Sequence, residues 1–349
     1  MLSLLIFLYC IQLGSASLLA YGKRRLSDKK SLGNAKTSIL VPFKNERDRI
    51  WPLLKSINNS AFKYKETDLF TQFEFIFIDD HSTDESIEFI LNELDVSCRI
   101  LKLDKTSGKK YAIIRGVEQS SYNRVLTLDA DVSFSEDYLF NISKTPCKSL
   151  TILPVHMQGK SSVEKLFTIE FSFLQHVTFG LAGFGKYILC NGANLLFTKE
   201  TFNQAIKVRE DAHIPSGDDM FLLKAVNTLN MTVFAFNRKE LNVVTSAPDS
   251  FVNLLNQRLR WITKTRDVSS LFGATFILLF NVLLFVCVYH VLLGDFWYAL
   301  PILIKIVSEG VSVGEKSNLF LLLVHQVYYP FYMLVLMFKI SIKSKYKWR

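Results

Sequence analysis

Between Thr37 and about Phe236, short apolar runs that end in polar or acidic residues alternate with stretches of helical spacing. The pattern predicts strands at 38–41, 73–78, 99–103 and 125–128, and helices at 46–58, 85–94 and 109–118. Such alternation favours an α/β fold with a mostly parallel sheet covered by helices. Ligands bind at the carboxyl ends of the strands in open sheets of this type, so the residues after each strand are the first candidates for a site.

The chain also contains long uncharged segments, and 49% of its 349 residues are hydrophobic. Residues 2–21 carry no charge and are long enough to span a bilayer. The cations Lys23, Arg24 and Arg25 follow at once, which predicts an anchor with its N-terminus outside. A cleaved signal peptide is the alternative, because Ser15-Ala16-Ser17 resembles a cleavage site, although the usual basic start is missing.

Two further spans are predicted at 268–294 and 317–338. Between them, Phe296 to Ile304 is followed by Lys305, and this piece looks too short to cross, so we expect an interfacial or re-entrant helix. The tail 339–349 has five cations and no acid, which predicts a cytoplasmic end. Three spans then place 23–267 in the cytoplasm, and we expect a bacterial inner membrane.

These segments divide the chain into six predicted parts. They are an N-terminal anchor (1–22), a linker (23–36), an α/β domain (37–250), an amphipathic interfacial helix (251–267), a C-terminal membrane region of two spans and the short piece (268–338), and a basic tail (339–349). The formal charge of +9 suits a membrane surface and an anionic ligand. The sequence contains no basic stripe of the kind that would predict nucleic-acid binding. The five scattered cysteines predict free thiols.

Asp129-Ala130-Asp131 directly follows the run Val125–Leu128. Both carboxylates therefore lie at a strand end, where they can hold a hard divalent cation, Mn²⁺ or Mg²⁺, that also binds a diphosphate. The alternative is an ordinary turn after a strand.

Two other strand ends carry candidate nucleotide ligands. Asp79 and Asp80 can accept hydrogen bonds from a base and a ribose, while Asp84 or Ser82 would cap the next helix. After the first strand, Pro42 to Glu46 places Glu46 within reach of a ribose, and Asn45 would serve as a helix cap.

Two helix starts carry charged groups. Gly108-Lys109 opens the third predicted helix and suits a phosphate, although its spacing is not that of a nucleoside-triphosphate loop. Asp218-Asp219 precedes a helix at 220–226, where the helix dipole favours a carboxylate. Asp219 would be a general base by its position, or else only a favourable first-turn acid.

The helix predicted at 251–266 has an apolar face and a second face on which Gln257, Arg260 and Trp261 recur at helical spacing. Arginine suits a diphosphate, and tryptophan can stack on a sugar. Alternatively, these side chains anchor a juxtamembrane helix among lipid headgroups.

Together these motifs resemble the membrane-bound family 2 glycosyltransferases with a GT-A fold, a group that includes cellulose, hyaluronan and chitin synthases and ceramide glucosyltransferases. The family pattern of D, D-x-D, D and Q-x-x-R-W is matched in order by Asp79-Asp80, Asp129 with Asp131, Asp219, and Gln257 with Arg260 and Trp261. The resemblance covers about 37–266 and implies a Rossmann-like, mostly parallel nucleotide-sugar-binding domain with terminal transmembrane helices.

The resemblance also implies roles. It predicts an inverting transfer from a UDP-sugar, with Asp129 and Asp131 on the metal and Asp219 as base. Arg260 would neutralise the leaving group, and Gln257 and Trp261 would complete the catalytic set. The donor would contact the set Pro42, Glu46, Asp79, Asp80, Lys109 and Asp129, and the acceptor the set Asn191, Gly192, Ala193, Asn194, Asp218 and Trp261.

Two positions depart from the family pattern. His81 and Lys110 stand where small residues are usual, and neither removes a catalytic group. With so few predicted spans, we expect transfer of one sugar to a lipid or lipid-linked acceptor. A processive polysaccharide synthase with assembly partners, or a non-catalytic nucleotide-sugar-binding scaffold, are the alternatives. A glycoside hydrolase would give no reason for Gly108-Lys109 or Arg260.

Overall fold

The computed structural model describes residues 2–26, 35–208, 218–265, 283–314 and 318–342. The chain forms two compact units, which are considered separately. The sheet unit comprises the described residues within 25–156 and 181–246, and the helical unit those within 1–24, 157–180 and 247–347. Residues 27–34 of the predicted linker, residues 266–282 and residues 343–349 of the basic tail lie outside the described residues.

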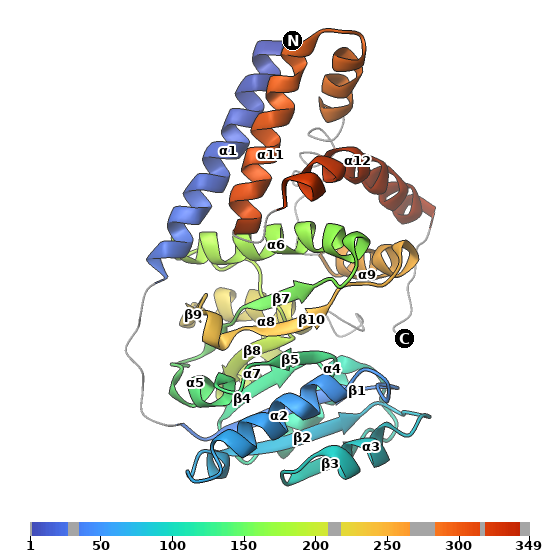
Figure 1. Cartoon of the computed structure of the whole chain (residues 1–349). Coiled ribbons are helices and arrows are strands. Elements are labelled where there is room, and N and C mark those ends of the chain that lie inside the picture. Colours follow the sequence, from blue (N-terminus) through green and yellow to red (C-terminus); the bar gives the residue numbers. More distant parts are fainter. Residues whose placement is uncertain (1, 27–34, 209–217, 266–282, 315–317, 343–349) are drawn as a thin grey trace. The chain divides into compact units, whose positions relative to one another are not determined.

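The sheet unit is built on a seven-stranded mixed sheet (Figure 1). Its strands, in spatial order, are β3 (Cys98–Lys102), β2 (Phe73–Asp79), β1 (Thr37–Phe43), β4 (Arg124–Leu128), β8 (Asn194–Thr198), β6 (Leu150–Ile152) and β9 (Val233–Ala235). The first four strands are parallel. Strand β8 is antiparallel to both of its neighbours. The predicted α/β class with a mostly parallel sheet is therefore confirmed.

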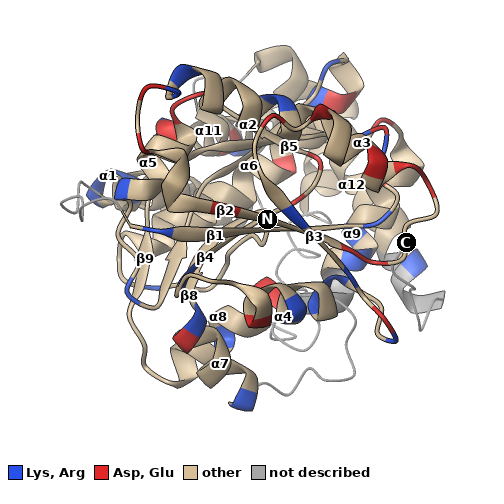
Figure 2. Ribbon diagram, turned by 90° about the horizontal axis from the view of Figure 1, so that it is seen from below, with Lys and Arg blue, Asp and Glu red and all other residues tan. Residues whose placement is uncertain are grey.

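Helices cover both faces of this sheet, which explains why β1 and β4 are mostly apolar and are buried along their whole length (Figure 2). Helices α4 (Lys109–Gln119), α7 (Lys199–Val208) and α8 (Asp218–Thr228) lie on one face, and α2 (Trp51–Lys63) and α3 (Ser86–Glu93) on the other. Helix α4 packs closely, because a Cβ at Gly116 would lie 2.9 Å from Cδ1 of Leu40.

A smaller three-stranded sheet has the order β5 (Val132–Phe134), β10 (Val243–Ser246) and β7 (Val155–Gln158). Strand β5 follows directly on the Asp129–Asp131 turn, so the turn is held by a strand on either side. The remaining short elements are α5 (Tyr138–Lys144), η1 (Phe70–Gln72) and η2 (Lys239–Leu241).

The second predicted helix starts later than expected. Asn45 was predicted to cap a helix that begins at Glu46, but α2 begins at Trp51, with Pro52 in its first turn. The prediction was wrong because Asn45 has a left-handed φ of 53° and its side-chain oxygen accepts a hydrogen bond from the N–H of Thr83 at 2.8 Å. Asn45 thus joins the loops after β1 and β2.

The helical unit consists of helices from three separate parts of the chain. They are α1 (Leu2–Arg25), α6 (Ser162–Ala182), α9 (Phe251–Thr265), a helix at Leu283–Leu292, η3 (Phe296–Tyr298), α11 (Ala299–Val313) and α12 (Leu319–Ile342). The predicted α/β domain of 37–250 is thus interrupted, because residues 157–180 pack with the terminal helices. On α6, His176 Nε2 lies 2.9 Å from the carbonyl oxygen of Ala16 on α1, and Phe167 packs with Leu254 on α9.

Three described helical segments are long and apolar enough to cross a membrane: Leu2–Arg25, Phe296–Val313 and Leu319–Leu336. The piece predicted at 296–304 is longer than expected, because the helix continues past Lys305 to Val313, and its interfacial or re-entrant placement stays a prediction. The charge of Lys305 is compensated by Glu309 one turn later, so it does not end the segment. Most of the span predicted at 268–294 lies outside the described residues, and its described end forms the apolar helix Leu283–Leu292.

Candidate active site

The carboxyl ends of β1, β2 and β4 bring the predicted nucleotide and metal residues to one edge of the sheet. Asp79 ends β2, and its register partner on β1 is Phe43. Pro42 lies buried in β1 beside Ile78. Strand β4 pairs with β1 on the other side and leads into Asp129. Asp79 and Asp129 therefore lie at the carboxyl ends of their strands, as the sequence predicts.

Asp80 organises the loop that follows β2. Its side chain is 1% exposed, and Oδ2 accepts a hydrogen bond from the N–H of Gly108 at 2.9 Å, while Oδ1 lies 3.1 Å from Nδ1 of His81. Gly108 has a φ of 118°, a conformation that favours glycine. Asp80 therefore fixes the start of α4, from which Lys109 projects.

His81 has a left-handed φ of 60°, which explains why a small residue is usual at this position in the family pattern. The histidine is held because its ring bridges Asp80 and the carbonyl oxygen of Asp104, which lies 3.0 Å from Nε2. These contacts raise the pKa of His81, the bond to Asp104 first and that to Asp80 second. The departure from the pattern thus has a structural compensation.

Asp84 was predicted to cap the next helix, but the N-cap residue of α3 is Glu85, and Asp84 serves mainly as a brace between loops. Its Oδ2 accepts a hydrogen bond from the N–H of Arg47 at 3.0 Å, and its Oδ1 accepts one from the N–H of Ser86 at 3.2 Å. Ser82 accepts from the N–H of Asn45 at 3.0 Å. The loops after β1 and β2 therefore form one connected rim around the strand ends.

Lys109 connects the two groups of predicted carboxylates. Its Nζ donates to Oδ1 of Asp129 in an ion pair. Burial alone would lower the pKa of Lys109, but the carboxylates of Asp129, Asp219 and Asp218 raise it above its ordinary value. Because Lys109 interacts electrostatically with all three carboxylates, the D-x-D turn and the start of α8 lie close enough to form one charged site.

The D-x-D turn carries more negative charge than its neighbours compensate. Desolvation and the adjacent Asp129 raise the pKa of Asp131. Burial raises the pKa of Glu46 to about 7; Arg49, 2.8 Å away, opposes this, and Asp131 and Asp129 add to it. A divalent cation at Asp129 and Asp131 would relieve this repulsion, so the residues present fit a metal.

Within the described residues no group of three or more histidine, cysteine, aspartate or glutamate side chains is arranged as a complete metal site. Two carboxylates would therefore leave coordination positions for diphosphate oxygens and water, as is common for Mg²⁺.

Asp219 lies in the first turn of α8 and is held by the loop before β8. Its Oδ2 accepts a hydrogen bond from the N–H of Gly192 at 2.9 Å, and its Oδ1 accepts one from the N–H of Met220. The thiol of Cys190 donates to the carbonyl oxygen of Asp219 at 3.2 Å. The predicted base and the predicted acceptor loop are thus in direct contact.

Asn194 departs from its predicted role in acceptor binding. It is fully buried, its Nδ2 donates to the carbonyl oxygens of Pro154 and Leu241, and its Oδ1 accepts from the hydroxyl of Tyr138. All of these bonds are 2.7–2.9 Å long. Asn194 has no surface for a substrate, and Ala193 is also buried, so both support the loop that presents Gly192.

The Q-x-x-R-W residues lie on α9, within the helical unit. Gln257 and Trp261 are half-buried and Arg260 is exposed. Both half-buried side chains contact Arg258, which is 2% exposed: its Nη1 donates to Oε1 of Gln257, and its guanidinium carbon lies 4.2 Å from the centre of the Trp261 ring. Their part in the reaction stays a prediction.

Sequence reasoning missed Arg258 and its partner Glu170. Nε of Arg258 donates to Oε2 of Glu170 on α6 at 2.6 Å, and Nη2 donates to the carbonyl oxygen of Phe167 at 3.4 Å. A signal was present, because Glu170 is a lone acid in the apolar, aromatic stretch 166–174 of α6. Such an acid needs a partner, and an arginine between the motif residues was the available one.

The chain matches two protein-family models. The model described as glycosyl transferase family 2 matches residues 38–145, and the one described as glycosyl transferase family group 2 matches residues 124–339. The second match covers more than half of the chain and includes the D-x-D turn, Asp219 and α9.

Curated relatives agree with these matches. An undecaprenyl-phosphate 4-deoxy-4-formamido-L-arabinose transferase of Yersinia enterocolitica is 35% identical over 101 residues, which are 28% of this chain and 29% of the relative. A poly-beta-1,6-N-acetyl-D-glucosamine synthase of Staphylococcus epidermidis is 28% identical over 141 residues, 39% of this chain and 32% of the relative. The chain thus spans about a third of the length of each.

A solved structure supports the fold. A mannosyltransferase of Pyrobaculum calidifontis, in complex with GDP-mannose and Mn²⁺, aligns with a TM-score of 0.55 and 13% identity over 99% of this chain and 100% of the other. The predicted GT-A fold is thereby confirmed. With its matching family models, sheet topology and site geometry, the chain belongs to family 2 of the glycosyltransferases and is an enzyme of that class.

Proposed function

We propose that the enzyme transfers a single sugar, with inversion, from a UDP-sugar to a lipid or lipid-linked acceptor at a membrane. The observation that carries the proposal is the contact between Asp219 and Gly192, beside the Lys109–Asp129 ion pair. It supports the proposal because a carboxylate that could take a proton then lies near a lysine that could hold a departing diphosphate.

The donor would lie along the rim of the sheet. Glu46 and the loops that the buried Asp79 and Asp80 hold would surround the nucleoside, and Lys109 would pair with the diphosphate. Mn²⁺ or Mg²⁺ held by Asp129 and Asp131, when bound, supplies positive charge to the diphosphate oxygens. Lys109 already pairs with Asp129, so it can shift from the carboxylate to a phosphate without a large movement.

Asp219 would act as the base. One of its oxygens is held by the N–H of Gly192, which orients the carboxylate toward the loop at 191–192. An acceptor hydroxyl placed there would lose its proton to Asp219 as its oxygen attacks the anomeric carbon, while the bond to the diphosphate breaks on the opposite face. One displacement inverts the centre. Gln257, Arg260 and Trp261 would complete the site by binding diphosphate and acceptor.

The acceptor is proposed from two observations. The relative from Yersinia is named for a lipid-phosphate acceptor, and only three described helical segments are long and apolar enough to cross a membrane. A polymer that is made and exported by one chain needs a channel lined by several spans. Because the relative from Staphylococcus is named as a polysaccharide synthase, a processive synthase is the second candidate. The size of the product distinguishes it from a transferase that adds one sugar.

We also propose that the sheet unit faces the cytoplasm. This rests on Lys23, Arg24 and Arg25 directly after the first apolar segment. Because Phe296–Val313 is long enough to cross, the side of the C-terminal tail now depends on the number of crossings. Single cysteines could be introduced at exposed Lys55 and at exposed Leu292 and treated with a membrane-impermeant reagent. The labelling would show on which side of the membrane each position lies.

Donor turnover tests the proposal directly. The full chain in nanodiscs would be given a panel of UDP- and GDP-sugars with Mn²⁺ or Mg²⁺, and released nucleoside diphosphate would be measured with and without membrane lipid extract. We expect metal-dependent release from one UDP-sugar, and a product of lipid size. A ladder of products would instead establish the processive synthase.

Matched variants separate the roles. Asp219→Asn keeps the oxygen that accepts from Gly192 but cannot take a proton, so we expect donor binding without transfer. Asp131→Asn should weaken metal-dependent binding. Asp137→Asn is the control, because the side chain of this half-exposed aspartate pairs with Lys63 and Tyr64, away from the strand ends. If the wild type binds donors but never releases a nucleotide, the scaffold alternative holds.

A further inference from the structure

The ring of His81 connects two loops at the rim of the large sheet. Its Nδ1 lies 3.1 Å from Oδ1 of Asp80, and its Nε2 lies 3.0 Å from the carbonyl oxygen of Asp104. Asp80 belongs to the loop after β2, whereas Asp104 begins the exposed segment 104–107, which follows β3 and leads into α4. The histidine therefore ties its own loop to the segment from which α4 starts.

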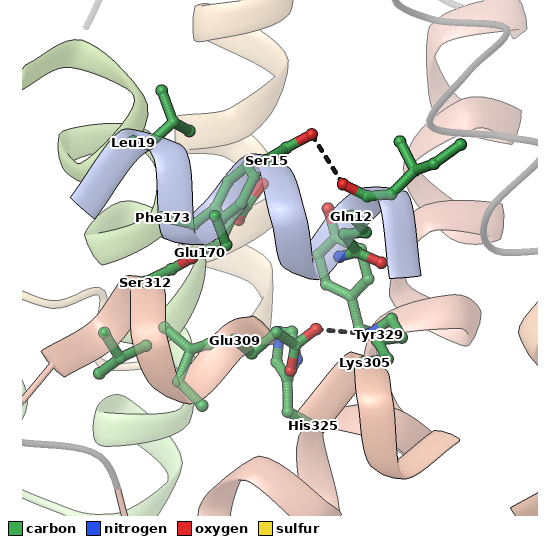
Figure 3. Close-up of a pocket in the computed structure, with 14 residues that line it drawn as sticks. Gln12, Ser15, Leu19, Glu170, Phe173, Lys305, Glu309, Ser312, His325 and Tyr329 are labelled. Carbon is green, nitrogen blue, oxygen red and sulfur yellow. Dashed lines mark hydrogen bonds and ion pairs between the residues drawn. The ribbon is translucent and has the colours of Figure 1, made fainter. Parts of the chain in front are cut away.

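Both contacts require a hydrogen from the histidine. A carboxylate and a carbonyl oxygen only accept hydrogen bonds, so each ring nitrogen has to donate, and only the charged imidazolium has two N–H groups. His325 in the helical unit gives the contrast, because its Nδ1 lies 3.1 Å from Oε2 of Glu309, a contact that a single N–H satisfies (Figure 3). The geometry at His81 thus matches a charged ring. In agreement, the bond to Asp104 and then the bond to Asp80 raise the pKa of His81 above its ordinary value of 6.5.

The surroundings of the ring link its charge to the start of α4. The carboxylate of Asp80 favours the charged ring, and the ammonium group of Lys44, 3.9 Å from Oδ2 of Asp80, opposes it from the loop after β1. Asp80 is 1% exposed and is held on both sides, by His81 at Oδ1 and by the N–H of Gly108, 2.9 Å away, at Oδ2. Loss of the proton from His81 would turn a ring lone pair toward Asp80 or toward the carbonyl oxygen of Asp104, so one of the two bonds would be lost.

We propose that His81, as a cation, is a positioning residue for the sugar donor: it holds segment 104–107 and the start of α4 so that Lys109 is presented to the diphosphate. The inference rests on the proposed function, which assigns the diphosphate to Lys109. Because the pKa of His81 is raised on folding, this support is complete below pH 6.5 and is lost as the pH rises through the raised pKa. A small residue, which the family pattern has at this position, makes neither contact and gives no such pH dependence.

The charge on His81 can be measured without any donor. The full chain in detergent micelles, with carbon-13 at Cε1 of every histidine, would be titrated across neutral pH and followed by NMR. The signal that is missing from His81→Gly belongs to His81. We expect this signal to titrate with a pKa above 6.5, and a pKa at or below that value would overturn the proposal.

The same variant tests the effect on the donor. His81→Gly removes the ring but keeps the backbone, because glycine adopts the φ of 60° freely. Below pH 6.5 we expect the KM for the donor to rise on the order of fivefold, with kcat little changed, since the lost ring holds the site and does not touch the reacting atoms. Above the pKa of His81 the difference should shrink. Glu46 titrates at about 7 in both chains, so their comparison at each pH isolates His81.

Asn230→Gly is the matched control, because Asn230 is exposed just after α8 and has a similar φ of 52°. It should leave the KM and its pH profile as in the wild type. If His81→Gly does not fold, His81→Asn replaces it, since asparagine also tolerates this φ and does not titrate. Equal KM values and pH profiles in the wild type and the His81 variant would overturn the inference. A wild type that releases no nucleotide from any donor would instead refute the proposed function, and the donor role of His81 with it.

Discussion

The Glu170–Arg258 pair gives the sharpest test of how the Q-x-x-R-W helix is held. Arg258 is 2% exposed and Glu170 is 22% exposed, so the pair is largely removed from water. Removal of one partner from a buried pair costs roughly 3–5 kcal/mol, since a charge is left without compensation. Because water still reaches Glu170, we expect the lower end, about 3 kcal/mol, for either Glu170→Met or Arg258→Met.

The double variant separates electrostatics from packing. With both charges gone, two methionines of similar volume remain, and replacement of a buried ion pair by apolar residues is often close to neutral. We therefore expect the double variant to be more stable than either single variant. Unfolding in detergent by guanidinium, followed by tryptophan fluorescence and extrapolated to water, would give the free energies.

Activity should not recover with stability. Arg258 also donates to Gln257 and lies against the Trp261 ring, and methionine does neither. We expect transfer by the double variant to be slower by on the order of tenfold to a hundredfold, as for misplaced groups in an active site. Lys63→Met with Asp137→Met, at a solvent-accessible pair, should shift the unfolding midpoint far less than either single change at the buried pair. If the two buried changes are simply additive in stability, the pair is not a coupled unit and the reasoning is refuted.

Three other changes have expected outcomes. The pKa of Glu46 rises from 4.5 to about 7 on folding, so the protonated carboxyl stabilises the fold fully below pH 4.5, and this contribution is lost as the pH rises through 7. In EDTA, Glu46→Gln should reduce the pH dependence of the free energy of unfolding by about 3 kcal/mol, measured by unfolding at a series of pH values. Asn194→Leu leaves two carbonyls and a hydroxyl unpaired and should cost about 3 kcal/mol in the same assay. Gly116→Val should cost about 1–3 kcal/mol by overpacking against Leu40.

The strand ends could be predicted from the sequence because local patterns determine them. A short apolar run followed by aspartates fixes both the strand and the position of the carboxylates, and β2 with Asp79 and β4 with Asp129 follow this rule. The boundary of α2 was not predictable in this way. Asn45 is as good a helix cap by its residue type as it is a loop brace, and only its distant partner Thr83 decides between the two.

The role of Asn194 shows a similar limit. Its place in a loop of small residues suggested contact with an acceptor, yet its three partners lie on segments 40 to 56 residues away in sequence. A buried asparagine with every hydrogen bond satisfied is a structural residue, and this cannot be distinguished from a ligand-binding residue until the fold is known. Gly192, two positions earlier, keeps its predicted contact with the site through its N–H to Asp219.

The full length of the apolar helical segment at 296–313 was missed for an energetic reason. A lysine in an apolar run is costly when it is considered alone, so the run appeared to end before Lys305. In the structure Glu309 follows one turn later on the same face, and His325 and Gln326 approach from α12. A paired lysine no longer carries the cost of a single charge, so a scan that counts charges one by one underestimates the segment. Paired charges at i and i+4 should therefore be scored together before a segment is rejected.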